Sequence, residues 1–291
     1  ERENHLNFKE IYSCFGGNPS FLHEAPRLLH RALPKGFSTT HDASIKPSGY
    51  EFITPVVKHL RDWRQIQTAV NVLRDFGWEP NQTCGLHYHF SHDKLSPDEP
   101  KTLRTIFRAF YYIEPLIYAL LPPERRNNPY CKPLAQFFNK SEIEKDIKLD
   151  YWYYKKFWDL KALRPGEGER DVLPVPEPPT EETRHMPFPE LPSQPRLFGE
   201  GPITRGVIEA NKDFHYNPAR YIGCNLHSIW QHQTLEFRYF PMVLDFTYIF
   251  HWGNILKRIL RYIIDGRSTA ALPTIWENRH NPKSMLKEIA D

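Results

Sequence analysis

The sequence CGLHYHFSH, residues 84–92, alternates apolar and polar side chains in the way that decides the fold class. Its apolar positions are Leu86, Tyr88 and Phe90, and its intervening positions include His87 and His89. A period of two is typical of a β-strand with one face on a core, and it puts both histidines on the other face. Two such histidines can share a metal and its bound phosphate, although a pair of surface histidines would give the same pattern.

A second stretch, QTLEFRYFP at residues 233–241, repeats this alternation and places Glu236 and Arg238 on one face. A carboxylate and a guanidinium projecting together can hold a metal and, beside it, the phosphate that the metal binds. An exposed ion pair on a sheet is the simpler interpretation of ExR taken alone, and it would add little stability.

A third candidate is Glu51, which lies in the apolar strand YEFI within DASIKPSGYEFITP, residues 42–55. A carboxylate in that setting is costly unless a cation meets it, and a metal would do so. An edge-strand glutamate that points to water is the alternative.

The apolar spacing around these motifs predicts an α+β protein. Three segments show the three- and four-residue period of amphipathic helices, at about 58–76, 98–121 and 245–264, and Pro115 should bend the second. Period-two stretches predict strands at 37–42, 50–54, 84–91, 220–229 and 233–240. We expect the first two and the last two strands to form hairpins, because only short connections separate them, and hairpins imply antiparallel pairing.

Bulk composition excludes several classes of protein. The 38 Lys and Arg residues against 35 Asp and Glu residues leave a net charge of +3, too weak a field to indicate a nucleic-acid or membrane partner. No apolar run approaches the roughly 18 to 20 residues that span a bilayer, so we expect a soluble, cytoplasmic protein. The four cysteines have no CxxC spacing, which argues against a zinc knuckle or a disulfide framework.

We expect a single catalytic domain over 1–291, interrupted by a proline-rich insertion at about 164–205. The insertion has no apolar periodicity and cannot build a core of its own, so we expect it to extend over the surface.

Taken together and in this order, the motifs resemble the glutamine-synthetase-like superfamily and, more closely, its amidoligase family. The similarity includes D-x-S…G-x-E-x-x-x-P (42–55), CGLHxHF (84–90), ERRNNPYC (124–131) and RYxxxNLHS followed by TLEFRYF (220–240). It runs from about residue 37 to 265, apart from the insertion. The resemblance implies a glutamine-synthetase-like curved antiparallel sheet with helices packed on its outer face.

The resemblance also implies roles for single residues. His87 matches a metal ligand and His89 a contact to the nucleotide phosphates, while Glu51 and Glu236 match further metal ligands. Arg238 matches the arginine that meets the transferred phosphoryl group. The remaining candidates are cations or hydroxyls for the ATP phosphates or a substrate carboxylate, with Arg220 assigned to catalysis: Arg125, Arg126, Arg220 and Ser91.

The function implied is that of an ATP-dependent carboxylate–amine ligase, which forms an amide or peptide bond through an acyl-phosphate intermediate. Its cofactors would be ATP with Mg²⁺ or Mn²⁺, because carboxylate-rich sites favour hard cations. Its substrates would be small-molecule or peptide carboxylates and amines, with no nucleic acid and no membrane; an oligomer is compatible with this interpretation.

Two alternatives remain open at this point. The bare chemistry of HxH also suits a zinc-dependent hydrolase that uses His87, His89 and either Glu51 or Glu236. The other alternative is a non-catalytic binding descendant of the ligase fold. It is favoured because the family opens with a strand that carries two carboxylates as ExE, and here the only candidate for that opening strand is Glu1 with Glu3, with no strand before them.

Overall fold

The computed structural model of the 291-residue chain describes residues 7–16, 31–42, 45, 49–145, 149–150, 153–154, 156, 205–213, 217–266, 272, 277 and 280–281. Residues 7–16 are described by their backbone. The proline-rich insertion at about 164–205 lies outside these ranges, except for Arg205. None of the helices within the described ranges combines the length and the apolarity needed to cross a membrane.

The described strands form one antiparallel sheet of six strands in the order β2-β3-β1-β4-β6-β5. Their bounds are β1 Asn7–Gly16, β2 Ser38–His41, β3 Gly49–Ile53, β4 Gly85–Ser91, β5 Cys224–Asn225 and β6 Leu235–Pro241. Helices accompany the sheet, so the α+β class is confirmed. The predicted pairing of the two strands that flank residues 43–48 is also confirmed, because β2 and β3 are antiparallel neighbours.

The three predicted amphipathic helices are present as α2 Leu60–Asp75, α3 Pro100–Leu120 and α9 Phe246–Ile264. Helix α3 continues through Pro115, and Asp245 fixes the start of α9 by accepting hydrogen bonds from the backbone N–H groups of Thr247 and Tyr248. Shorter helices are α4 Pro123–Arg126, α5 Lys140–Glu144, α7 Arg205–Asp213 and α8 His227–His232, with 3₁₀ turns η2 Leu134–Gln136 and η5 Pro218–Arg220.

The predicted strand over 220–229 is present only as Cys224–Asn225, and its predicted antiparallel pairing with the next strand is confirmed for these two residues alone. The predicted short WQH turn is wrong, because a helix connects the two strands. Only the two residues of β5 pair with β6, and α8 follows at once. Next to the helix start, the Asn225 side chain accepts a hydrogen bond from the backbone N–H of His227. The helix ends at His232, and the residue that follows, Gln233, has a left-handed φ of 55°. The apolar alternation of Ile222, Cys224 and Leu226 therefore reflects burial rather than a continuous strand.

Strand β1 was not predicted, yet it lies at the centre of the sheet between β3 and β4. Its pairing with β4 shifts register between Phe8 and Glu10, which interrupts the period of two that would have marked the strand in the sequence.

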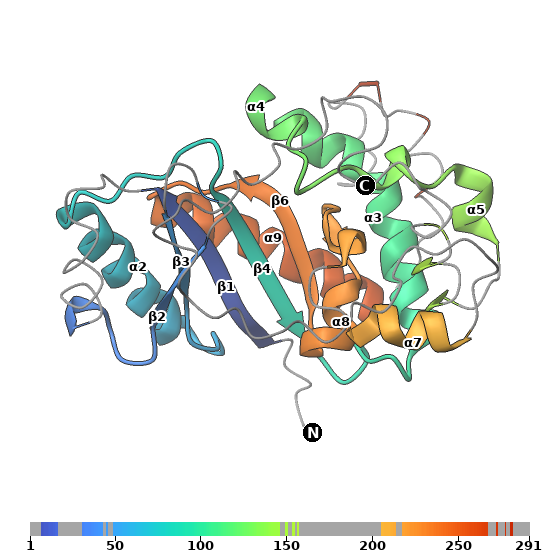
Figure 1. The fold of residues 1–291 in the computed structure, drawn as a ribbon, viewed down its shortest axis with the longest axis horizontal. Helices are drawn as coiled ribbons and strands as arrows, with labels where there is room; N and C mark the ends of the chain where they lie inside the picture. Colours follow the sequence, from blue (N-terminus) through green and yellow to red (C-terminus); the bar gives the residue numbers. More distant parts are fainter. Residues whose placement is uncertain are drawn as a thin grey trace, which may run out of the picture.

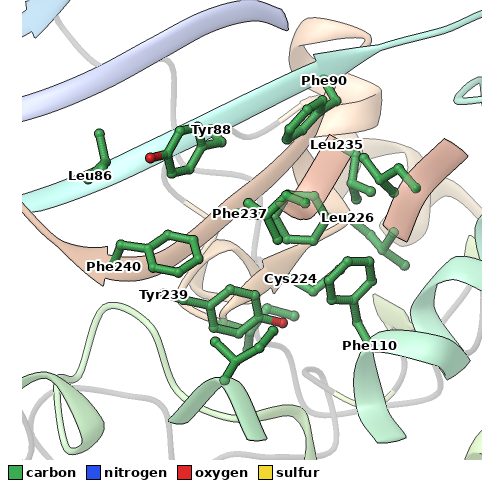
Figure 2. Close-up of a cluster of buried hydrophobic side chains, with 14 of the residues drawn as sticks. Leu86, Tyr88, Phe90, Phe110, Cys224, Leu226, Leu235, Phe237, Tyr239 and Phe240 are labelled. Atoms are coloured by element: carbon green, nitrogen blue, oxygen red, sulfur yellow. The ribbon is translucent and has the colours of Figure 1, made fainter. Parts of the chain in front are cut away.

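The core lies against the apolar face of β4 and β6. Figure 1 shows α9 passing behind the sheet, with α2 near β2 and β3 at one end and α3 at the other. Phe110 of α3 packs on Phe237 with ring centroids 4.5 Å apart, and Trp252 of α9 packs on Phe240 at the same distance. Figure 2 shows Phe90 of β4, Phe237 of β6 and Phe110 of α3 within one cluster of buried side chains. The opposite face of the two strands carries the polar residues.

Candidate active site

The polar face of β4 and β6 brings two histidines onto one carboxylate. His89 and Glu236 are register partners in the β4–β6 pair. Glu236 Oε1 lies 3.4 Å from His87 Nδ1 and 3.5 Å from His89 Nε2, and all three residues are buried. Burial, and then the positive charge of Arg238, hold the pKa of His87 well below its ordinary value. Its imidazole is therefore neutral at pH 7, the state in which a histidine binds a metal.

The Glu236 carboxylate is held from two further sides. Arg238 Nη1 lies 2.6 Å from Oε1, and Asn225 Nδ2 donates to Oε2 over 2.5 Å. Burial alone would raise the pKa of Glu236, but Arg238 and then His89 outweigh it, so the pKa lies well below its ordinary value. Glu236 is therefore a buried carboxylate that is ionised at neutral pH.

Glu51 contributes a second carboxylate from β3. Burial, and then the negative charge of Asp42, raise its pKa to about 7, while Arg238 acts in the opposite direction. A carboxyl group whose charge is disfavoured in this way would be stabilised as an anion by an added cation.

A pocket of about 540 Å³, open to solvent, joins these groups to α8. Its sheet side is lined by Glu51, His87, His89 and Glu236. Its other side, which we call the α8 wall, consists of Arg220, Asn225, His227, Ser228, Gln231 and His232. Both carboxylates of the lining therefore come from the sheet, and its arginine, Arg220, comes from η5.

Three predicted nucleotide-binding residues do not line this pocket. Arg125 is buried and donates from Nε and Nη2 to the carbonyl oxygens of Tyr239 and Arg238, at 3.0 and 2.7 Å. Arg126 donates to the carbonyls of Leu121 and Ala119 at the end of α3. Ser91 ends β4 and is partly exposed. Their roles in nucleotide binding stay predictions.

The absence of a side chain at Gly85 allows Arg125 to lie next to His87. A Cβ at this position would lie 2.8 Å from Arg125 Nη2 and 3.0 Å from His87 Nε2, both closer than ordinary van der Waals contact. The glycine of the CGLHYH motif thus makes room for a guanidinium beside the first histidine.

Of the α8 wall, only Arg220 was predicted from the sequence; Asn225, His227 and Ser228 were missed because they fell in the predicted strand 220–229. The signal available in the sequence was the presence of the polar residues Asn225, His227 and Ser228 within an apolar run. In the structure each of the three is buried, with 2% of its surface exposed. Buried polar groups of this kind need partners, and they mark sites or networks more often than the apolar residues around them.

The centre of the sheet corrects the expectation about the first strand. Glu1 and Glu3 lie outside the described residues, whereas β1 precedes the β2–β3 hairpin and pairs Glu10 with His89, Tyr12 with His87 and Cys14 with Glu51. Directly paired positions of neighbouring antiparallel strands share a face of the sheet. Positions 10, 89 and 236 therefore form one row across β1, β4 and β6.

The donor types on the sheet side, imidazole nitrogen and carboxylate oxygen, fit a divalent cation such as Mn²⁺ or Mg²⁺. Among the side chains that the structure describes, no three His, Cys, Asp or Glu residues are arranged as a ready-made coordination sphere. The donor atoms are therefore of the right types for such a cation. In this structure, Glu236 is paired with Arg238 and hydrogen-bonded to Asn225.

Comparison with protein families agrees with the motif analysis. Residues 29–152 match the family model described as "Putative amidoligase enzyme". This segment is amidoligase-like. The match includes Glu51, His87 and His89, and it ends before the α8 wall and Glu236. No curated protein and no solved structure matches the chain significantly.

Proposed function

We propose that this amidoligase-like chain is an ATP-dependent carboxylate–amine ligase, which forms an amide or peptide bond through an acyl phosphate on a glutamine-synthetase-like curved sheet. The observation that carries the proposal is the buried group of His87, His89, Glu236 and Arg238 in one place, with Glu51 in the same pocket. A ligase needs such an arrangement, because phosphoryl transfer depends mainly on positioned charge and requires no side-chain nucleophile.

In the first step, an oxygen of the acid substrate attacks the γ-phosphorus of ATP. A new bond from this oxygen to phosphorus forms, the bond to the β-phosphate oxygen breaks, and ADP leaves with the electron pair. The acid is thereby activated, since phosphate is a far better leaving group than hydroxide.

We assign the transferred phosphoryl group to Arg238, whose partner Glu236 lines the pocket. Arg238 Nη1 contacts Glu236, and Nε donates to the carbonyl oxygen of Tyr130 over 3.2 Å, so two contacts fix the plane of the guanidinium. A guanidinium held in this way can bind phosphoryl oxygens without reorganising as negative charge develops.

Glu51, His87 and Glu236 would hold Mg²⁺ or Mn²⁺, which would supply positive charge beside the phosphate oxygens. The neutral imidazole of His87 keeps its lone pair available, and Glu51 gains a counter-ion for a charge that burial disfavours. We assign the nucleotide phosphates to His89, with Arg125, Arg126 and Ser91 as further candidates, and a substrate or phosphate anion to Arg220.

The test is ADP release from ATP with Mg²⁺ or Mn²⁺, measured over a panel of amino acids and small acids with hydroxylamine as the amine. Hydroxylamine converts an acyl phosphate to a hydroxamate, which is detected by its colour with iron. We expect acid-dependent ADP release and hydroxamate, both lost in Arg238→Lys. Zinc-dependent amide cleavage without ATP would support the hydrolase instead, and the absence of nucleotide turnover would support the non-catalytic alternative.

A further inference from the structure

The α8 wall contains a histidine, His227, whose Nδ1 is hydrogen-bonded to a buried tyrosine, Tyr154. Tyr154 Oη lies 2.6 Å from His227 Nδ1, and both residues are 2% exposed. Tyr154 is itself held by ring contacts to Trp230 and Tyr153, at centroid distances of 5.2 and 5.4 Å. The contact thus joins two packed side chains rather than two mobile ones.

The direction of this hydrogen bond decides where His227 carries its proton. Burial, and then the neighbouring Tyr153, raise the pKa of Tyr154 far above its ordinary value, so the phenol keeps its hydrogen. When that hydrogen is donated to Nδ1, the neutral imidazole must hold its own proton on Nε2.

His227 is shared between the pocket and Tyr154. It lines the pocket, whereas Tyr154, its partner at Nδ1, does not. Arg220 and Ser228 line the same wall, and the two carboxylates among the lining residues, Glu51 and Glu236, come from the sheet. This wall therefore suits an anionic oxygen.

We propose that the Nε2–H group of His227, together with Arg220, binds the carboxylate of the acid substrate, and that Tyr154 is a positioning residue which holds His227 in this tautomer. The inference rests on the proposed ligase function and names the part of the pocket that takes the acid. His227 donates a hydrogen bond throughout and transfers no proton. The same donor remains useful when the acid becomes an acyl phosphate, because its oxygens stay electron-rich.

The tautomer can be measured directly by NMR on the full chain labelled with ¹⁵N-histidine. Long-range ¹H–¹⁵N correlations distinguish Nε2–H from Nδ1–H, and His227→Gln assigns the signal among the 14 histidines. We expect Nε2–H in the wild type and a mixture of tautomers in Tyr154→Phe, which keeps the ring packing and loses the donor. Wild-type protein with the Nδ1–H tautomer, or no change in Tyr154→Phe, would overturn the proposal.

Tyr88→Phe is the matched control. This variant also loses one buried hydrogen bond from a tyrosine hydroxyl, which in the wild type donates to the carbonyl oxygen of Ile249 over 2.7 Å. The bond lies on the core face of the sheet, away from the pocket. We expect it to lower stability about as much as Tyr154→Phe, since each loses one buried hydrogen bond, and to leave the His227 signal unchanged. A change of tautomer in this control as well would show a general effect of lost packing and would overturn the positioning role.

Ligand titrations identify the anion. Acetate, glutarate and L-glutamate are added to the labelled protein in one arm, and MgATP alone in the other. We expect at least one carboxylate to shift the His227 signal and MgATP to leave it in place; a shift with MgATP only would assign the wall to the nucleotide. In the hydroxamate assay, His227→Gln should raise the KM for the acid by about tenfold, the effect of losing one good hydrogen bond, with the KM for ATP unchanged. The expected tautomer and carboxylate shift without any acid-dependent ADP release would remove the ligase proposal and leave a carboxylate-binding site.

Discussion

Arg238 and Glu236, two residues apart on β6, form a buried ion pair in which Nη1 lies 2.6 Å from Oε1. The pair is enclosed by other polar contacts, since Asn225 holds the second carboxylate oxygen and Tyr130 the guanidinium Nε. Such a pair contributes little net stability, because the desolvation of two charges offsets their attraction. Glu236 lines the pocket, whereas Arg238 is not among its lining residues. We expect the two residues to have separate chemical roles, which substitution can distinguish.

Arg238→Lys should lower kcat by about 10²- to 10³-fold, because lysine keeps one positive charge and loses the planar fork that can hold two phosphoryl oxygens. The KM for ATP should change much less, since the interaction strengthens as charge develops during transfer. Steady-state ADP release, with circular dichroism to confirm folding, measures both. Turnover equal to that of the wild type would show that Arg238 serves only as the partner of Glu236.

Glu236→Gln should instead weaken cation binding, so that activity is partly recovered at high Mg²⁺ or Mn²⁺. The amide retains the shape of the carboxylate but removes the charge that faces His87, His89 and Arg238. Activity is measured against cation concentration, and the melting temperature is measured alongside it. If the variant fails to fold, or if its activity is independent of the cation, the carboxylate is structural.

Gly223→Ala should destabilise the protein by about 3 kcal/mol or more, the upper range for overpacking a core. A Cβ at this position would lie 1.9 Å from Cε1 and 2.4 Å from Cδ1 of the Tyr239 ring, which is fully buried. Thermal unfolding measures the loss. Gly85→Ala is the comparison: its Cβ would meet the ends of Arg125 and His87, so catalysis should suffer more than stability. Equal melting temperatures of Gly223→Ala and the wild type would contradict the close packing of Gly223 on the Tyr239 ring.

Glu114 should make stability depend on pH. It is buried in α3, where it accepts hydrogen bonds from Leu134 N at 2.6 Å and Tyr239 Oη at 2.9 Å, and burial raises its pKa from 4.5 to about 8. Since the folded-state pKa is the higher one, its stabilising contribution is complete below pH 4.5 and is lost as the pH rises toward 8. The slope should reach about 1.4 kcal/mol per pH unit.

Urea unfolding of the wild type and Glu114→Gln across this pH range tests the assignment. The variant has no titrating group at this position. The free energy of unfolding of the variant minus that of the wild type should therefore increase between pH 4.5 and 8. A constant difference between the two proteins would show that Glu114 titrates normally.

Much of the fold followed from periodicity. The helices α2, α3 and α9 and the strands β3, β4 and β6 were predicted within a few residues, because each carries apolar side chains on the core. Strand β2 was also predicted within two residues, although none of its side chains is buried. The convergence of His87, His89 and Glu236 followed from the same alternation, once β4 and β6 were neighbours.

The remaining features depend on contacts that a local pattern does not encode. Strand β1 is paired on both sides, and its register shift near Glu10 breaks the alternation. Helix α8 has only six residues, too few to show a helical period, and its N-cap residue, Leu226, gives no capping signal. The position of Arg125 depends on β6 carbonyls more than 100 residues away in sequence and on the absence of a side chain at Gly85.

The central place of β1 has a consequence for how the chain folds during synthesis. Among the described strands, β1 alone joins β2–β3 to β4–β6–β5. It leaves the ribosome before the other described strands, yet its second partner, β4, is complete only at Ser91 and the sheet only at Pro241. Until β4 has been made, the nascent chain exposes a free edge of β1, which can pair with other chains. A protein that lost residues 7–16 would have two half-sheets with open edges at β3 and β4, and its principal defect would be aggregation rather than slow turnover.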